Sequence, residues 1–323
     1  MTITRRHLGG ATLGAGLLAA PAVRAQAFPN RTIRMVVGFA AGGNSDTMSR
    51  LVAPRMGEFL GATIVVENRT GAGGALAAGA VAAAPADGHA LLFDAASFLV
   101  AQFVSRNLPF DYETAFTPVG GVAEQPYVLA VGARTGIRDF AGYLDTARLS
   151  QDGMVYGSPN LGSVGHLAGV LLAHRSGLRM EHVSYRGGAE AARDLAAGSL
   201  PSAYLSGNTL NPLLESGRAR AIALTTAERR GMPGVPTIAE SGFPGFDLTS
   251  WNAVFCRAGT PEEVRLRLEA AVDHATGDPE VVARLAAMGA LRVPADSDAL
   301  ARRIARERVL LRDLIRDTGL SLG

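Results

Sequence analysis

Ser163 and His166 are the side chains whose types could support nucleophilic catalysis, because a serine activated by a histidine is the centre of many hydrolase sites. The segment NLGSVGH lacks the first glycine of the G-x-S-x-G nucleophile turn, and His166 follows Ser163 by three residues on the same predicted helix turn. Helix capping by Ser163 and a structural role for His166 are therefore favoured. A serine hydrolase that uses Ser163 or Ser97 stays open as an alternative.

The sequence gives little support to metal or cofactor chemistry. His166, His174 and His182 recur every eight residues, but no cluster of His, Cys and carboxylates has the spacing of metal ligands. All 31 basic residues are arginine, which excludes a pyridoxal Schiff base and a phosphate-loop lysine. In GAGGAL, Leu76 takes the third glycine position of G-x-G-x-x-G counted from Gly71, which argues against a dinucleotide site. We expect no cofactor and no metal.

Four glycine-containing turns are a stronger signal than any catalytic pair. They are FAAGGNSD (39–46), NRTGAGG (68–74), SPNLGSVGH (158–166) and YRGGAE (185–190). Each lacks bulk where backbone would approach a ligand, and each precedes a predicted helix whose N-terminus is partly positive. We expect Asp46, in the first turn of its helix, to cap backbone N–H groups. Two turns in each half of the chain predict an anion held between two lobes.

The elements that must position these turns alternate along the chain. Strands are predicted at 32–39, 62–68, 89–95, 127–132, 154–158, 181–186, 219–226 and 251–259. Helices are predicted at 45–60, 74–84, 139–147, 163–175, 189–197, 261–275 and 296–317. This βαβ order predicts an α/β fold with a mainly parallel sheet and a ligand at the C-terminal edge of its strands. We expect lobe 1 to comprise 28–126 and 251–323, and lobe 2 to comprise 127–250.

The first 27 residues form a predicted export signal. Arg5 and Arg6 precede a short apolar stretch, and small residues permit cleavage after Ala25 or Ala27. TRRHLGG approaches the twin-arginine pattern, so either export route is open. Removal of the leader leaves 28 arginines against 29 acids, a net charge of −1. The sequence therefore lacks the excess of positive charge that is typical of nucleic-acid-binding proteins. The single Cys256 cannot form an internal disulfide.

The ordered motifs of the mature chain closely resemble the Bug/TctC family of tripartite tricarboxylate transporter substrate-binding proteins. The resemblance covers essentially all of the mature chain and is carried by FPNRTIRMVVGFAAGGNSD, VVENRTGAGG, APADGHALLF, LPFDYETAFTPVGGV, YGSPNLGSVGHLAG, VSYRGGAEAARDLAAG and RARAIALTTAERRGMPGVPTIAESGFPGFDLTSWNAVFCRAGTP. The family pattern F-x-x-G-G-x-x-D falls on Phe39, Gly42, Gly43 and Asp46. The pattern G-S-x-x-H-L falls on Gly162, Ser163, His166 and Leu167.

The resemblance implies a two-lobed, type II periplasmic-binding (venus-flytrap) fold with the ligand in a cleft between the lobes. It implies a periplasmic, non-enzymatic and monomeric receptor that holds a small carboxylate through backbone N–H groups and ordered water. Its partners would be the membrane components of a tripartite tricarboxylate-type transporter or, alternatively, a membrane sensor protein.

The expected ligand-binding set combines the turns with three further side chains near the predicted cleft. Trp251, the only tryptophan, suits either the core or a cleft wall. Where the family usually carries two aspartates, this chain has Pro201 and Leu205, which argues against an amino-acid ligand. The expected set is Phe39, Ala41, Gly42, Gly43, Asn44, Ser45, Asp46, Asn68, Gly71, Ala72, Gly73, Ser97, Gly162, Ser163, His166, Gly187, Gly188, Ser206 and Trp251.

Overall fold

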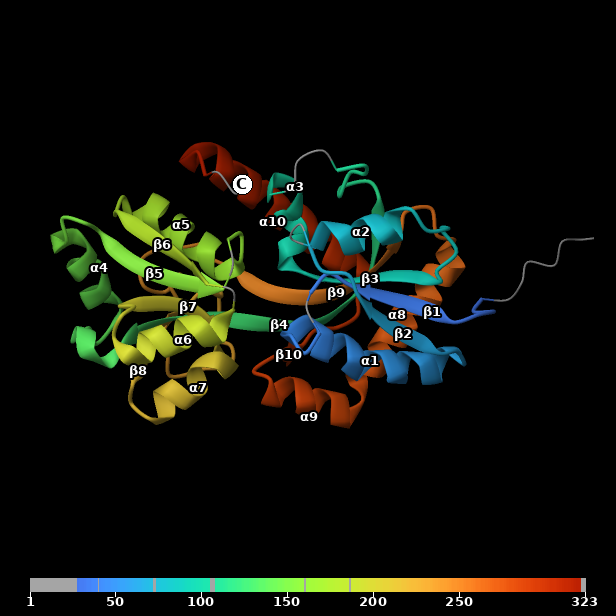
Figure 1. Cartoon of the computed structure of the whole chain (residues 1–323), viewed down its shortest axis with the longest axis horizontal. Helices are drawn as coiled ribbons and strands as arrows, with labels where there is room; N and C mark the ends of the chain where they lie inside the picture. The colour runs from blue at the N-terminus through green and yellow to red at the C-terminus, as the bar shows by residue number, and fades with distance from the viewer. Residues whose placement is uncertain are drawn as a thin grey trace, which may run out of the picture.

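The computed structural model describes residues 28–39, 41–71, 74–104, 108–159, 161–185 and 187–320. The chain folds into two lobes of strands and helices, with β4 and β9 running between them (Figure 1). The predicted leader and two members of the expected binding set, Ala72 and Gly73, lie outside the described residues.

The first lobe is built on a parallel core. β1 (Ile33–Val37) pairs in parallel with β2 (Ile64–Asn68) on one side and with β3 (Ala90–Ala95) on the other. After these strands the chain enters α1 (Asn44–Leu60), α2 (Ala75–Ala82), η2 (Ala96–Leu99) and α3 (Ala101–Val104). Because each helix follows the C-terminal end of a parallel strand, the first two glycine turns lie at one edge of the sheet.

The second lobe repeats this arrangement. β5 (Met154–Pro159) pairs in parallel with β6 (Met180–Tyr185) and β7 (Ser202–Ser206). The other elements of this lobe are η3 (Ala133–Thr135), α4 (Phe140–Leu149), α5 (Val164–Ser176), α6 (Gly188–Ala197), α7 (Gly207–Glu215) and β8 (Ala219–Leu224). The β5–α5 and β6–α6 turns therefore lie at the C-terminal edge of the second set of strands.

Two long antiparallel strands join the lobes. The first part of β4 (Phe116–Gly132) pairs with β9 (Thr249–Arg257), and from Tyr127 onward β4 pairs with β7 and β8. β9 also runs antiparallel to β3, so the strand order is β2-β1-β3-β9-β4-β7-β5-β6. The expectation of a mainly parallel sheet is correct within each lobe and wrong at these crossing strands. The domain limits stay a prediction.

The chain returns to the first lobe after β9 and closes with helices. These are α8 (Glu262–Gly277), α9 (Pro279–Ala287) and α10 (Ser297–Thr318), with the short strand β10 (Leu291–Arg292) pairing with β4. The prediction of only two closing helices is wrong, because α9 lies between them. α10 packs on β4 and reaches α5 of the second lobe (Figure 1).

Separate apolar clusters cover the two faces of the first-lobe sheet. Met48 and Val52 of α1 and Val272 of α8 pack with Phe93 on one face. Leu92, on the neighbouring position of β3, belongs to the cluster on the opposite face. This two-sided burial holds the strand ends, and hence the turns that follow them, in fixed positions.

Candidate ligand-binding site

The β1–α1 turn is held by a network centred on Asp46. Gly42 has a φ of +78°, and its N–H donates to Asp46 Oδ2 at 2.8 Å. Arg50 Nε donates to Asp46 Oδ1 at 3.0 Å, and Asn68 Nδ2 donates to the same oxygen at 2.8 Å. Burial acts to raise the pKa of Asp46, but the hydrogen bonds from Arg50, Gly42 and Asn68 outweigh it, so its pKa is lowered. Of the backbone N–H groups that Asp46 was expected to cap, it thus accepts that of Gly42, which precedes the helix.

Two residues of the crossing strands tie this turn to the rest of the molecule. Asn44 Nδ2 donates to Gln125 Oε1 on β4 at 2.5 Å. Asn252 Nδ2 on β9 donates to Ser45 Oγ at 2.8 Å, and this contact is buried. Sequence reasoning missed Gln125 and Asn252, although a polar side chain inside an otherwise apolar strand was the available signal. The first turn is therefore anchored to both strands that connect the lobes.

The β5–α5 turn of the second lobe has the same construction. Gly162 has a φ of +77°, and its N–H donates to His166 Nδ1 at 3.0 Å, four residues further along. Ser163 is the N-cap of α5, and its Oγ accepts the His166 N–H at 3.3 Å. Gly162 and His166 thus correspond to Gly42 and Asp46. The structure confirms helix capping by Ser163 and a structural role for His166.

A polar chain behind this turn links two histidines. The rings of His166 and His182 stack with centroids 4.1 Å apart, and His182 Nε2 lies 2.8 Å from Ser158 Oγ. Burial lowers the pKa of His166 to about 4. Burial and the neighbouring His166 lower the pKa of His182 to about 3, so both rings are neutral at pH 7. Within the described residues no carboxylate bonds to either ring, so the acid of a hydrolase triad is not in place here.

The helices that follow β1, β2, β6 and β7 begin without a side-chain cap. Their N-cap residues are Gly43, Gly74, Gly187 and Ser206, and none makes a side-chain capping bond. By contrast, α4, α9 and α10 are capped by the carboxylates of Asp139, Asp278 and Asp296. Open N-termini leave backbone N–H groups and a partial positive charge for an anion. Three of these open ends, at Gly43, Gly74 and Gly187, lie at glycine turns, whereas the helix after the fourth glycine turn, α5, is capped by Ser163.

The remaining expected residues occupy different surroundings. Ala41 is exposed, and Phe39 is partly buried against the first-lobe core. Ser206 Oγ lies 3.0 Å from Thr209 Oγ1 in the first turn of α7. Trp251 is only 2% exposed, and its Nε1 donates to Glu307 Oε2 of α10 at 2.8 Å. Of the two roles considered for Trp251, the structure shows the core position.

One further expected residue, Ser97, lies near a buried acid, as does Gly74 at the end of the second glycine turn. Gly74 and Ser97 flank Asp94, the carboxyl group at the C-terminal end of β3, whose Oδ2 lies 3.6 Å from where a Cβ on Gly74 would stand. Ser97 Oγ is buried and has no hydrogen-bond partner among the described residues. In the part of the chain that the structure describes, no histidine bonds to Ser97 Oγ, so no base is in place for the second hydrolase candidate.

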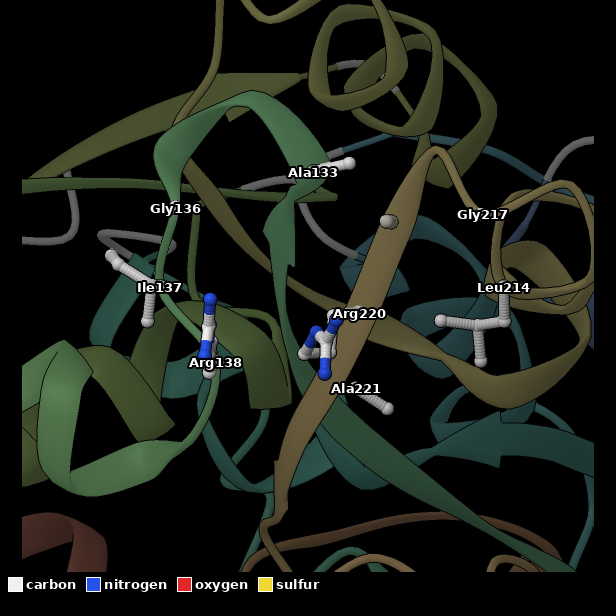
Figure 2. A pocket seen from close by; sticks show the side chains of 9 residues that line it. Ala133, Gly136, Ile137, Arg138, Leu214, Gly217, Arg220 and Ala221 are labelled. Carbon is white, nitrogen blue, oxygen red and sulfur yellow. The ribbon is translucent and has the colours of Figure 1, made fainter.

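A cavity of about 510 Å³ lies elsewhere, at the outer end of the second lobe. Figure 2 shows it between the segment after β4, the end of α7 and strand β8, with Arg138 and Arg220 on its wall. None of the expected ligand-binding residues lines it. The remainder of its lining is Ala133, Gly136, Ile137, Leu214, Gly217, Ala219 and Ala221.

Two other classes of site find no support in the described parts of the chain. There, no group of three or more His, Cys, Asp or Glu side chains is arranged to hold a metal ion. No helix in the same residues combines the length and apolarity that crossing a membrane requires.

Comparison with known proteins identifies the family. Residues 48–320 match the model of the tripartite tricarboxylate transporter family receptor, TctC. The chain belongs to the TctC family. A TctC-family relative from Pseudomonas sp. (strain P51), a UPF0065 protein in the tcbD-tcbE intergenic region, is 37% identical over 287 residues, which cover 88% of this chain and 85% of the relative.

Solved TctC-type structures share the fold over most of their length. R. palustris Rpa4515 with adipate has a TM-score of 0.78 and 32% identity, covering 91% of this chain and 99% of that chain. MatC from Rhodopseudomonas palustris with bound malate has a TM-score of 0.75 and 31% identity, and the match covers 89% of this chain and 100% of the MatC chain. The periplasmic binding protein BugD has a TM-score of 0.75 and 28% identity, and the match covers 91% of this chain and 99% of the BugD chain. The fold is thus the two-lobed α/β fold of periplasmic binding proteins, with its cleft between the lobes.

Proposed function

We propose that the chain is a periplasmic solute receptor that captures a small carboxylate between its lobes and delivers it to a tripartite tricarboxylate-type membrane transporter. The observation that carries this proposal is the matched pair of turns. Gly42 with Asp46 and Gly162 with His166 have the same backbone geometry on opposite lobes. Similar proteins that contain adipate and malate support a carboxylate as the anion.

Backbone donors suit a protein that must release its ligand. Open helix N-termini supply directed N–H groups and about half a positive charge each. A buried arginine clamp would add charge-assisted bonds and leave an unpaired cation once the ligand departs. Arg50, the arginine of α1 closest to the turn, is instead paired with Asp46. The turns therefore favour reversible binding.

We propose further that the receptor does no chemistry on its ligand and works in the periplasm after loss of residues 1–27. Ser163 caps a helix, and both imidazoles of its neighbourhood are held neutral without a carboxylate in the described contacts. The TctC family consists of solute-binding receptors, and relatives of this chain are periplasmic binding proteins.

Isothermal titration of protein that has been unfolded, dialysed and refolded tests the proposal, because refolding strips any retained ligand. We expect one-to-one binding of at least one carboxylate in a panel that includes adipate, malate, hexanoate and benzoate. The uncharged 1,6-hexanediol, a control with the carbon chain of adipate, should give no heat. Absence of binding by every carboxylate, with native circular dichroism retained, would overturn the proposed function.

A further inference from the structure

The polar side chains of the two matched turns are already occupied by the protein itself. Asn44, Ser45, Asp46, Asn68, Ser163 and His166 each bond to a partner in their own lobe or on a crossing strand. These bonds hold the turns in place. Backbone N–H groups are what remain for a polar group of the ligand, and they suit one carboxylate.

An exposed leucine accompanies the turns on each lobe. Leu76, in the first turn of α2, is 59% exposed, and its Cδ1 lies 2.8 Å from where a Cβ on Gly71 would stand, so it lies back over the β2–α2 turn. Leu161, immediately before Gly162, is 44% exposed. Single exposed leucines are common on protein surfaces, but these two lie at the ligand-binding turns of opposite lobes. They offer apolar contact area to whatever the turns hold.

Beside the first turn of α6, the side chains nearest to Gly188 are Thr209, whose Oγ1 lies 3.3 Å from where a Cβ on Gly188 would stand, and Leu205. Leu205 is fully buried at the end of β7, and its Cδ2 lies 3.6 Å from where a Cβ on Gly188 would stand. A leucine at this place provides no polar contact to a ligand beside the first turn of α6.

The charges near the first-lobe turns disfavour a second carboxylate. Arg50 lies 3.0 Å from Asp46, and Arg69 lies 3.6 Å from Glu67, so each of these cations already faces an acid. At the end of β3, the carboxyl group of Asp94 is buried, and its Oδ2 has no hydrogen-bond partner among the described residues. A second anionic group would therefore meet arginines whose charge is already compensated by an acid.

We infer that the chain prefers a carboxylate with one charged end and an apolar body, and that Leu76 and Leu161 are the residues that select this body. The inference rests on the proposed function and specifies its substrate class. It separates this chain from its similar proteins that contain the dicarboxylates adipate and malate.

Matched ligand pairs test the substrate class. Hexanoate and adipate have six carbons and differ by one terminal carboxylate, and benzoate and terephthalate differ in the same way on a ring. In each pair of which at least one member binds, we expect the monocarboxylate to bind at least 10-fold more tightly than the dicarboxylate, as measured by isothermal titration at pH 7.5. Tighter binding of the dicarboxylate in either pair would overturn the inference and leave the proposed function standing. Failure of every carboxylate would remove both.

Leucine variants test the two selecting residues. We expect Leu76→Asn and Leu161→Asn each to weaken the monocarboxylate about 5- to 10-fold, as the loss of part of a leucine's apolar contact predicts. Leu149→Asn is the control, because Leu149 is 85% exposed at the end of α4. The variants should leave the melting temperature and the affinity for the matching dicarboxylate almost unchanged. Equal effects of all three variants on the monocarboxylate would contradict the assignment of these leucines.

Discussion

At the scale of single residues, Asp94 combines burial with an unsatisfied carboxyl oxygen. It is 1% exposed at the end of β3, and its Oδ1 accepts the Ala95 N–H at 2.7 Å. Burial raises the pKa of Asp94 to about 7, and the bond from Ala95 opposes this only in part. The buried Tyr112 hydroxyl also has no partner among the described residues. The fold therefore tolerates this acid best in its neutral form.

Asp94→Asn should change how stability depends on pH. The pKa of an aspartate in the unfolded chain is near 3.9, below the pKa of Asp94 in the folded protein. The wild-type free energy of unfolding is therefore highest below about pH 4 and falls as pH rises to about 7. Asparagine does not titrate. We expect the free energy of unfolding of the variant, relative to that of wild type, to rise by about 2–4 kcal/mol between pH 4 and pH 8. A constant difference caused by the amide itself would add to this at every pH.

Urea unfolding at several pH values measures this gain. Asp152→Asn, at an exposed position, is the control and should show no comparable change with pH. A difference between Asp94→Asn and wild type that stays constant from pH 4 to pH 8 would argue against a raised pKa.

At the scale of elements, the turns depend on glycines in the left-handed region. Gly42 at φ +78° and Gly136 at φ +74° have no atom within 4 Å of where a Cβ would stand, so an alanine at either place meets strain without a clash. Gly42 lies in the β1–α1 turn, and Gly136 lies in the loop before α4. These positions separate backbone strain from ligand binding.

We expect Gly42→Ala and Gly136→Ala each to lower the free energy of unfolding by about 1–2 kcal/mol, because both force alanine into the left-handed region. Only Gly42→Ala should weaken carboxylate binding, by about 10-fold or more, because the strained turn moves its N–H groups. Denaturation and titration on the same samples provide the comparison. Equal affinities for the two variants would mean that the β1–α1 turn does not contact the ligand.

Sequence patterns predicted the four glycine turns and the strands and helices beside them, because strand-turn-helix junctions have strong local signals, but they missed β7 and α7. They missed most of β4, where only 127–132 was expected and the strand spans Phe116–Gly132. Pro118, Gly120 and Gly121 resemble strand breakers, but they lie at register shifts where Val293 and Ala295 approach the backbone closely. That approach depends on residues about 170 positions away, which no local pattern contains.

Other failures of prediction had a readable local signal. α9 begins with Asp278 as N-cap and Pro279 in its first turn, a common start for a helix. Gln125 and Asn252 stood out as polar residues in apolar strands, but no local pattern could pair them with the first turn, because the bonds join residues 81 and 207 positions apart. The types of the site residues were thus predictable, and the partners that hold them were not.

At the scale of the whole molecule, two equivalent turns lie on two lobes that a pair of crossing strands connects. β4 and β9 connect the lobes and also anchor the first turn through Gln125 and Asn252 (Figure 1). A ligand bound by both turns would hold the lobes together across these strands. The central claim is therefore that one carboxylate contacts backbone N–H groups of both lobes at once.

Amide NMR of protein labelled with ¹⁵N-glycine tests that claim most directly. The reporters are Gly43 at α1, Gly165 in α5 and Gly188 at α6, with Gly136 and Gly217 as remote controls. On titration with the tightest carboxylate of the panel, we predict saturating shifts of Gly43 and of at least one second-lobe reporter with the same dissociation constant, while both controls stay unchanged. Shifts confined to one lobe, or to the controls, would contradict the account.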